Sequence, residues 1–241
     1  MTSSDDDAGS GSGSPILRHP APTRGFEPAE PGDEEVHDAL EAHIERHFGP
    51  VAWVWHELAS HLVHIDVHVV EPSFGRPFYT LVTGGMSDRP MNVPDAAIEA
   101  GLADRAELLL CLPADWPLGQ QAFADEAAYW PIRLLKTIAR LPHEYDTWIG
   151  PWHSIPNGDP AEPYMPDLPF VAALVVEMLR CPPEAHTVVT ESGKEISLLA
   201  VVPLHQAEID VKLTQGSQAL LDAFRSATVS ELFDPERPSS V

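Results

Sequence analysis

The sequence predicts a single α+β domain, and three observations lead to that class. Short β-rich runs follow one another through the middle of the chain, each bounded by Pro, Gly, Asp or Ser, as strands of a sheet are. Helical spacing occurs mainly before and after these runs, so the elements are segregated rather than alternating. The chain has 241 residues and is 44% hydrophobic, which is enough apolar material for a core.

The domain is expected to cover residues 34–228, between two tails. Residues 1–33 are rich in Ser, Gly, Asp, Glu and Pro and offer no apolar face to bury, so they are predicted to be disordered. Residues 229–241 are predicted to be tail again. The N-terminus lacks a basic start followed by an apolar run, so we expect no export signal and a cytoplasmic protein.

The first half of the domain is expected to be one helix followed by strands. Apolar residues recur at helical spacing at Val36, Leu40, Ile44 and Phe48. The Gly-Pro pair at 49–50 stops that helix. Four runs are then predicted to be strands: VAWVWHEL at 51–58, HIDVHVV at 64–70, FYTLVTGG at 78–85 and AELLLCL at 106–112.

The second half is predicted to contain three more strands and three helices. Pro131 is expected near a helix start and Pro142 beyond its end, which predicts a helix from 131 to 140. Pro203 is expected to begin a helix of its own, and another is predicted over 214–224. The strand candidates are 145–152, 168–179 and 195–203, although 171–180 fits a short buried helix equally well.

The charge balance excludes several classes of partner. Lys and Arg number 14 against 37 Asp and Glu, for a formal charge of -23. This field repels nucleic acids and anionic membranes, and the longest apolar run, 170–176, is too short to span a bilayer. We expect a basic protein partner, because complementary fields speed encounter. Cys111 and Cys181 show no finger or disulfide spacing, which fits a reducing cytosol.

The stretch HLVHIDVHVV holds the densest group of metal-ligand residue types. Strand alternation places His64, Asp66 and His68 on one face. His64 and His68 would lie about 13 Å apart along the strand, too far to share one zinc, and His143 or His153 would have to be recruited. We expect no metal and no cofactor, with His64 and Asp66 as structural strand residues. A metal-dependent hydrolase built on His64, Asp66 and His68 is the alternative.

Two further motifs are expected to be structural. HELASH, from His56 to His61, has one residue more than HExxH, and residues five apart lie about 140° apart around a helix. His56 and Glu57 are therefore expected on a strand surface or in a turn. The pair at 84–85 lacks the GK[ST] of a phosphate loop and is predicted to be a tight bend where a strand ends.

Several segments, in the same order, resemble the suppressor of fused domain family as found in bacterial proteins. HIDVHVV, RPFYTLVTGGMSDRPMNVP and AELLLCLPADW resemble its first half. WPIRLLKTIARLPHEYDTWIGPWHSIPNG, EPYMPDLPFVAALVV and ISLLAVVPLHQAEIDVKLTQGSQALLDAF are similar to its second half. The resemblance spans about 36–226, and TLVTGGMSDRPM and PLHQAEIDVK are its most specific parts.

This resemblance implies a central mixed sheet flanked by helices and no known enzymatic activity. Members are binding proteins: the animal domain belongs to a negative regulator of Hedgehog signalling that holds a transcription factor through an extended peptide, and bacterial members are similar to immunity proteins proposed to neutralise polymorphic toxins. The first hypothesis is therefore a non-enzymatic immunity or antitoxin-type protein with a toxin partner. A regulatory peptide-binding domain is the alternative.

The partner surface is expected near the turn that follows the strand at 78–85. Gly85, Met86, Ser87 and Asp88 would leave backbone groups and one carboxylate open to an extended peptide, with Tyr79 as an aromatic neighbour. The competing interpretation is that Asp88 only caps its own turn.

Overall fold

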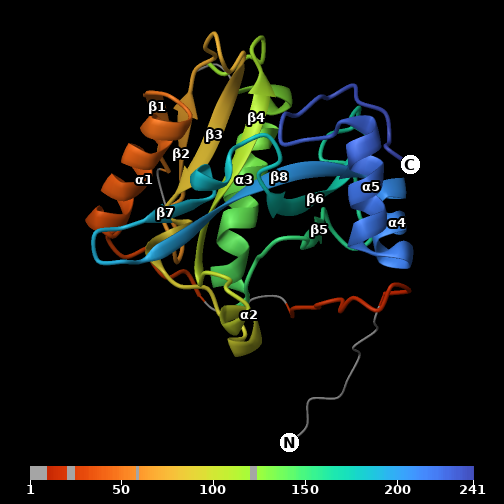
Figure 1. Ribbon diagram of the computed structural model, residues 1–241, viewed down its shortest axis with the longest axis horizontal. Coiled ribbons are helices and arrows are strands. Elements are labelled where there is room, and N and C mark those ends of the chain that lie inside the picture. Colours follow the sequence, from red (N-terminus) through yellow and green to blue (C-terminus); the bar gives the residue numbers. More distant parts are fainter. Residues whose placement is uncertain (1–9, 21–24, 58–59, 120–123) are drawn as a thin grey trace, which may run out of the picture.

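A mixed eight-stranded sheet forms the centre of the computed structural model, which describes residues 10–20, 25–57, 60–119 and 124–241 (Figure 1). The strand order is β1-β2-β3-β4-β8-β6-β5, and β7 pairs with β8 beside this path. The strands are β1 (Val51–Trp55), β2 (Asp66–Val70), β3 (Phe78–Gly84), β4 (Arg105–Pro113), β5 (Ser154–Pro156), β6 (Phe170–Glu177), β7 (Thr187–Val189) and β8 (Glu195–His205). The predicted α+β class is confirmed.

The sheet consists of two antiparallel parts that meet at one parallel seam. β1 to β4 form a meander of antiparallel neighbours. β8 is antiparallel to both β6 and β7. β4 and β8 join the two parts in parallel, with Arg105–Leu109 beside Ile196–Ala200.

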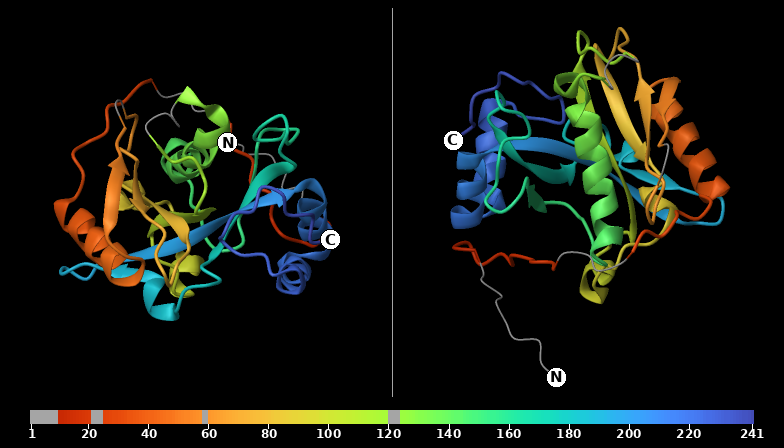
Figure 2. Two further views of the ribbon diagram at one scale, coloured as in Figure 1. Left: turned by 90° about the horizontal axis from the view of Figure 1, so that it is seen from above. Right: turned by 180° about the vertical axis from the view of Figure 1, so that it is seen from behind.

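Helices cover both faces of this sheet (Figure 2). α3 packs on one face, where its Trp130 and Leu135 join a core with Val67 and Val69 of β2. α1 packs on the other face, and α4 and α5 lie on that side over β6 and β8. The helices are α1 (Glu34–His47), α2 (Asp95–Glu99), α3 (Glu126–Glu144), α4 (Gln206–Gln215) and α5 (Ser217–Ala227), with 3-10 turns η1 (Met86–Asp88) and η3 (Pro183–Ala185).

α1 forms where the sequence predicts it. The Asp33 carboxylate caps its N-terminus by accepting from the N–H of Glu35 at 3.2 Å. Acidic residues in the first turn and basic residues in the last complement the helix dipole. Lys194, from the turn between β7 and β8, is ion-paired with both Asp33 and Glu35, which fixes the helix start against the sheet.

α3 is longer than predicted, because Pro131 and Pro142 lie inside it. Both prolines are buried with the core face of the helix. Trp116 Nε1 donates to the Ala128 carbonyl at 3.0 Å, so a tertiary hydrogen bond serves a carbonyl near the first proline. The predicted limits, 131 and 140, assumed that proline does not occur inside a helix. Burial of the core face outweighs this helix-breaking tendency.

Two other predictions for the second half are wrong. Residues 145–152 are not a strand, because Asp146 and Trp152 adopt positive φ angles of 50° and 72°, which extended backbone excludes. Pro203 lies within β8 rather than at a helix start. The pairing of β8 with β4 ends at Ala200. At Pro203, the edge of β8 that faces β4 therefore needs no backbone N–H for a hydrogen bond between strands.

Residues 231–240 belong to the folded domain, so the predicted C-terminal tail is wrong there. The N–H of Cys111 donates to the carbonyl of Glu231 at 3.0 Å, and the N–H of Phe233 donates to the carbonyl of Cys111 at 2.8 Å. This segment therefore continues the ladder beside β4 beyond the seam with β8. Phe233 is buried in the core shared with α3, and the Glu231 side chain accepts from two N–H groups, of Leu179 and Arg180.

The described part of the N-terminal segment lies against the domain without forming a helix or a named strand. Pro28 forms an isolated bridge with His61, and the N–H of Leu62 donates to the Glu27 carbonyl at 2.9 Å. Farther upstream, the N–H of Ser12 donates to the Leu213 carbonyl at 2.9 Å. Residues 1–9 and 21–24, which the sequence also assigns to a disordered tail, lie outside the described residues.

An ion pair between the partly buried Arg237 and the fully buried Glu208 holds the C-terminal segment to α4. Arg237 donates to both carboxylate oxygens of Glu208, at 2.5 and 2.8 Å, and to the Pro203 carbonyl at 2.8 Å. Ser240 contributes its N–H and its hydroxyl to the same carboxylate. Burial raises the pKa of Glu208, but these bonds outweigh burial and hold it below the ordinary 4.5.

We expect acid to weaken the fold through Glu208. Because its folded-state pKa is lowered, the ionised carboxylate contributes stability above pH 4.5 that is lost as the pH falls through the folded-state pKa. Urea unfolding of the wild type and of Glu208→Gln at about pH 7 and about pH 3 measures this. The difference in free energy of unfolding should be large at the higher pH and shrink at the lower one. An equal difference at both pH values would contradict the assignment.

Candidate functional site

The turn after β3 adopts a conformation that only glycine allows. Gly85 has φ +103°, and a Cβ added to it would lie 1.9 Å from the His64 carbonyl oxygen. The backbone then enters η1 at Met86. The expectation of a tight bend at the end of the strand is confirmed.

A buried carboxylate organises this turn from beneath. Glu107 of β4 is fully buried, and its Oε1 accepts from the N–H of Gly85 at 2.9 Å and from the N–H and hydroxyl of Ser87 at 2.9 and 2.6 Å. Its Oε2 accepts from the Thr83 hydroxyl at 2.6 Å. Burial raises the pKa of Glu107, and the bonds from Ser87 and Thr83 oppose that rise.

The carbonyls of the turn are also occupied. His143 of α3 donates from Nε2 to the Met86 carbonyl at 2.9 Å, and Arg105 donates to the Ser87 carbonyl. The Gly85 carbonyl accepts from the N–H of Asp88 at 3.3 Å. The prediction that the turn leaves its backbone open to a peptide is therefore wrong for the N–H groups of Gly85 and Ser87 and for the carbonyls of Gly85, Met86 and Ser87, because Glu107 and these donors already occupy them. Met86 and Ser87 are fully buried and support the turn from within.

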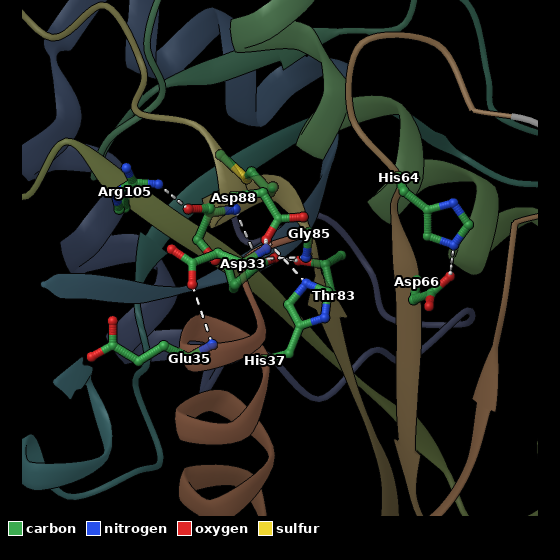
Figure 3. Close-up of polar contacts among 12 residues, drawn as sticks. Asp33, Glu35, His37, His64, Asp66, Thr83, Gly85, Asp88 and Arg105 are labelled. Carbon is green, nitrogen blue, oxygen red and sulfur yellow. Dashed lines mark hydrogen bonds and ion pairs between the residues drawn. The ribbon is translucent and has the colours of Figure 1, made fainter. Parts of the chain in front are cut away.

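Asp88 is the residue of the turn that reaches the surface. Its Oδ1 accepts from the Asp33 N–H at 3.2 Å and from His37 Nε2 at 3.0 Å (Figure 3). The bond to Asp88 raises the pKa of His37. Asp88 thus joins the turn to the start of α1, instead of capping its own turn.

A hollow of about 480 Å³ opens beside Asp88. Its walls come from the N-terminal segment, from α1 and from the loop before β2. They include Phe26, Glu30, His37, His64 and Asp88. We name this surface, defined by these five residues, the Asp88 hollow.

Tyr79 does not belong to this surface. It lies at the start of β3, and the turn follows the other end of the same strand, about 17 Å away at the usual rise per residue. Its ring packs edge-on against Trp53, with ring centroids 6.4 Å apart. The structure therefore brings together the turn residues but not the aromatic neighbour expected for them.

The histidines of the stretch HLVHIDVHVV do not form one cluster. His64 Nε2 lies 2.8 Å from Asp66 Oδ1, and the partner on the other carboxylate oxygen is His56, whose Nδ1 lies 2.7 Å from Oδ2. His68, expected with them, lies instead over Gly84: a Cβ there would come within 2.6 Å of its ring. Asp66 begins β2, whereas His64 precedes the strand.

The other two histidines considered as ligands lie in other environments. His143 is held by the Met86 carbonyl, as described above. His153 packs edge-on against Trp148, with centroids 4.2 Å apart. Neither completes a site with His64 and Asp66: among the described residues, the group of three side chains with metal-ligand geometry is His56, His64 and Asp66.

We expect Glu107→Gln to destabilise the protein. A glutamine amide turns one acceptor oxygen into a donor, so at least one of the buried donors around Glu107 loses its partner, at a cost of about 1–3 kcal/mol. Chemical denaturation measures the change. Glu126→Gln is the matched control, because Glu126 pairs with Arg133 on the surface and its exposed ion pair is worth about 0–1 kcal/mol. Equal effects of the two changes would refute the role of Glu107.

The fold and this carboxylate-centred turn define a mixed-sheet α+β domain, and sequence comparison gives its family. A family model described as Suppressor of fused protein (SUFU) matches residues 61–238, which is more than half of the chain. The chain belongs to the suppressor of fused family. The comparison with curated proteins found no match.

Solved structures share the fold at low identity. A SUFU homolog from Neisseria gonorrhoeae is 15% identical with a TM-score of 0.59, over 86% of this chain and 96% of that one. A chain of the Sufu-Fu complex is 14% identical with a TM-score of 0.56, over 89% of this chain and 93% of that one. Drosophila Suppressor of Fused is 14% identical with a TM-score of 0.52, and this chain spans about half of it, 52%.

The described helices include none with both the length and the apolar character needed to cross a bilayer.

Proposed function

We propose that this chain is a non-enzymatic, cytoplasmic protein-binding domain that neutralises a basic, toxin-like partner. Membership of the suppressor of fused family supports the binding role, as does the likeness to a chain of the Sufu-Fu complex. The formal charge of -23 is the observation that favours a basic partner. Carboxylates in such excess attract a basic protein at long range and repel nucleic acid.

The Asp88 hollow is the proposed contact surface. It presents the carboxylates of Asp88 and Glu30 together with the exposed ring of Phe26, so it offers charge and apolar area side by side. Gly85, Met86 and Ser87 serve this surface indirectly, by holding Asp88 in position. Asp88 keeps one carboxylate oxygen, Oδ2, for which no hydrogen bond to a described residue is found.

The first step of the test is to search the genes beside this one for a toxin-like domain, which then serves as the binding probe. Titration calorimetry at about 50 and 200 mM salt should show affinity that falls as salt rises, because screening shortens the electrostatic field. Co-expression should protect cells from that domain. Salt-independent affinity would overturn the electrostatic basis, and no binding would overturn the proposed partner. Equal affinity for a basic extended peptide alone would favour the regulatory peptide-binding alternative over the immunity role.

The contact surface is tested by Asp88→Asn, which keeps an acceptor for Asp33 and His37 but removes the charge. We expect weaker partner binding with a nearly unchanged melting temperature. Asp222→Asn is the control, because Asp222 is an exposed carboxylate on α5, beyond the hollow, and pairs loosely with Arg225 at 3.4 Å. Equal loss of affinity in the two variants would show that net charge matters and the hollow does not.

A further inference from the structure

We propose that His56, His64 and Asp66 form a binding site for one divalent transition-metal ion, with Zn²⁺ as the probe. One ligand atom from each residue lies within 4.8 Å of the other two. Two imidazoles and one carboxylate are ligands that Zn²⁺ accepts, and three protein ligands leave a position for water. The site shares His64 with the Asp88 hollow, but ion binding there does not rest on the proposed function.

The strand register brings these ligands together. β1 and β2 are antiparallel with Trp55 opposite Val67, so the next residue along, His56, comes opposite Asp66. The N–H of Glu57 donates to Asp66 Oδ1 at 3.1 Å, which holds the carboxylate at the mouth of the β1–β2 loop. His64 then enters from the other end of the loop, two residues before Asp66. The site therefore rests on sheet pairing, and not on surface side chains alone.

The hydrogen bonds around His64 point to a cation. Ser60 has one hydroxyl hydrogen, which it donates to Glu57 Oε2 at 2.8 Å, so its oxygen accepts from Nδ1 of His64 at 2.7 Å. A neutral His64 with its hydrogen on Nδ1 directs the lone pair of Nε2 at Asp66 Oδ1, 2.8 Å away. Two facing lone pairs repel one another, and a metal ion between them converts that repulsion into two coordinate bonds.

The hydrogen bonds from His64 to Ser60 and from Ser60 to Glu57 form an outer shell, meaning contacts that hold a metal-binding histidine in place without touching the ion. A ligating histidine usually donates its second ring N–H to a fixed acceptor, which sets the tautomer. Here that acceptor is Ser60, which is fixed by Glu57. Glu57 is fixed in turn by the N–H of Ile65 at 3.2 Å and by an ion pair with Arg140 of α3. Hydrogen bonds and one ion pair thus connect His64, through Ser60 and Glu57, to Arg140 of α3.

Access and dimensions fit a small ion. The His56 side chain is 68% exposed, so an ion can enter from solvent, whereas that of Asp66 is 19% exposed. Tetrahedral zinc with bonds of about 2.0–2.1 Å separates its ligand atoms by about 3.3 Å. The imidazole nitrogens of His64 and His56 lie 2.8 and 2.7 Å from their carboxylate oxygens, about half an ångström less than that separation, and the three ligand atoms all lie within 4.8 Å of one another. Small side-chain rotations therefore have to adjust these distances when an ion binds.

The test is a Zn²⁺ titration of untagged, metal-free protein, followed by calorimetry and by the ring resonances of the histidines. We expect one ion per chain, a raised melting temperature, and shifts at His56 and His64. His56→Ala should weaken binding more than 100-fold, and it should fold, because the residue is exposed after the end of β1. Ser60→Ala should weaken binding by about 10–100-fold through the outer shell.

His68→Ala is the matched control, because His68 is the nearby histidine that the geometry leaves out. It should keep the wild-type affinity for Zn²⁺ whatever it does to stability. Loss of binding in His68→Ala with retention in His56→Ala would overturn the proposed ligand set. Absence of binding at millimolar Zn²⁺ would overturn the site altogether and identify the group as a charged histidine held by a carboxylate.

Discussion

Gly85→Ala is expected to lower the free energy of unfolding by about 2–6 kcal/mol. Two costs add. The φ of +103° costs about 1–3 kcal/mol for a residue with a Cβ. The Cβ would also lie 1.9 Å from the His64 carbonyl oxygen, a backbone atom that a rotamer change cannot move, and such overpacking costs about 1–3 kcal/mol. Urea unfolding measures the total.

Gly101→Ala separates these two costs. Gly101, just after α2, has a similar φ of +93°, but nothing lies within 4 Å of an added Cβ. It should therefore lose only the conformational part, about 1–3 kcal/mol. The difference between the two variants reports the clash with His64. If both variants lose the same stability, the turn can shift away from His64, and the close approach does not constrain it.

Arg237→Ala is expected to cost about 3–5 kcal/mol, because it leaves the Glu208 carboxylate buried without its counter-charge. Glu208 is fully buried, and the guanidinium that neutralises it also lies over the rings of Phe170 and Phe224, at 5.3 and 5.8 Å from their centroids. The change thus removes a charge partner, two cation–π contacts and a hydrogen bond to Pro203 together. Thermal and urea unfolding measure the loss.

Two comparisons locate the source of that loss. Arg225→Ala removes an exposed arginine whose side chain is 67% accessible, and it should change stability by at most about 1 kcal/mol. The double variant Glu208→Gln/Arg237→Met should recover part of the stability that Arg237→Ala loses, because no charge then stays buried alone. A double variant less stable than Arg237→Ala would show that packing of the arginine, and not the stranded carboxylate, dominates.

Six of the eight strands could be predicted because their ends are local, whereas the three-residue strands β5 and β7 were not predicted. β3, for instance, is an apolar run that stops at two glycines, and both features lie within a few residues. The limits of α3 and the role of Pro203 could not be predicted. The conformational preferences of proline describe an isolated segment of chain. In the folded protein, burial stabilises Pro131 inside α3. Pro203 is tolerated in β8 because the pairing of β8 with β4 ends before it. Both causes lie far away in the sequence.

The candidate site was partly visible in the sequence. The turn itself was found, but its organising group, Glu107, was missed, although a single carboxylate inside AELLLCL was a signal that it must have partners. Those donors come from a turn about 20 residues earlier, as the bond from Ser87 shows. The sequence likewise does not show that His56 and Asp66 lie together, because only the register of β1 on β2 places them opposite each other.

The parallel seam between β4 and β8 also sets an expected order of assembly. Val70 and Thr80 of the β2–β3 hairpin are 10 residues apart, whereas Arg105 and Ile196 across the seam are 91 apart. Closing the longer loop costs about 2 kcal/mol more entropy. The antiparallel meander is therefore expected to form early from neighbouring hairpins, and the contacts of the seam are expected to form last, after the transition state of folding. Substitutions at Leu199 should then change the unfolding rate more than the folding rate.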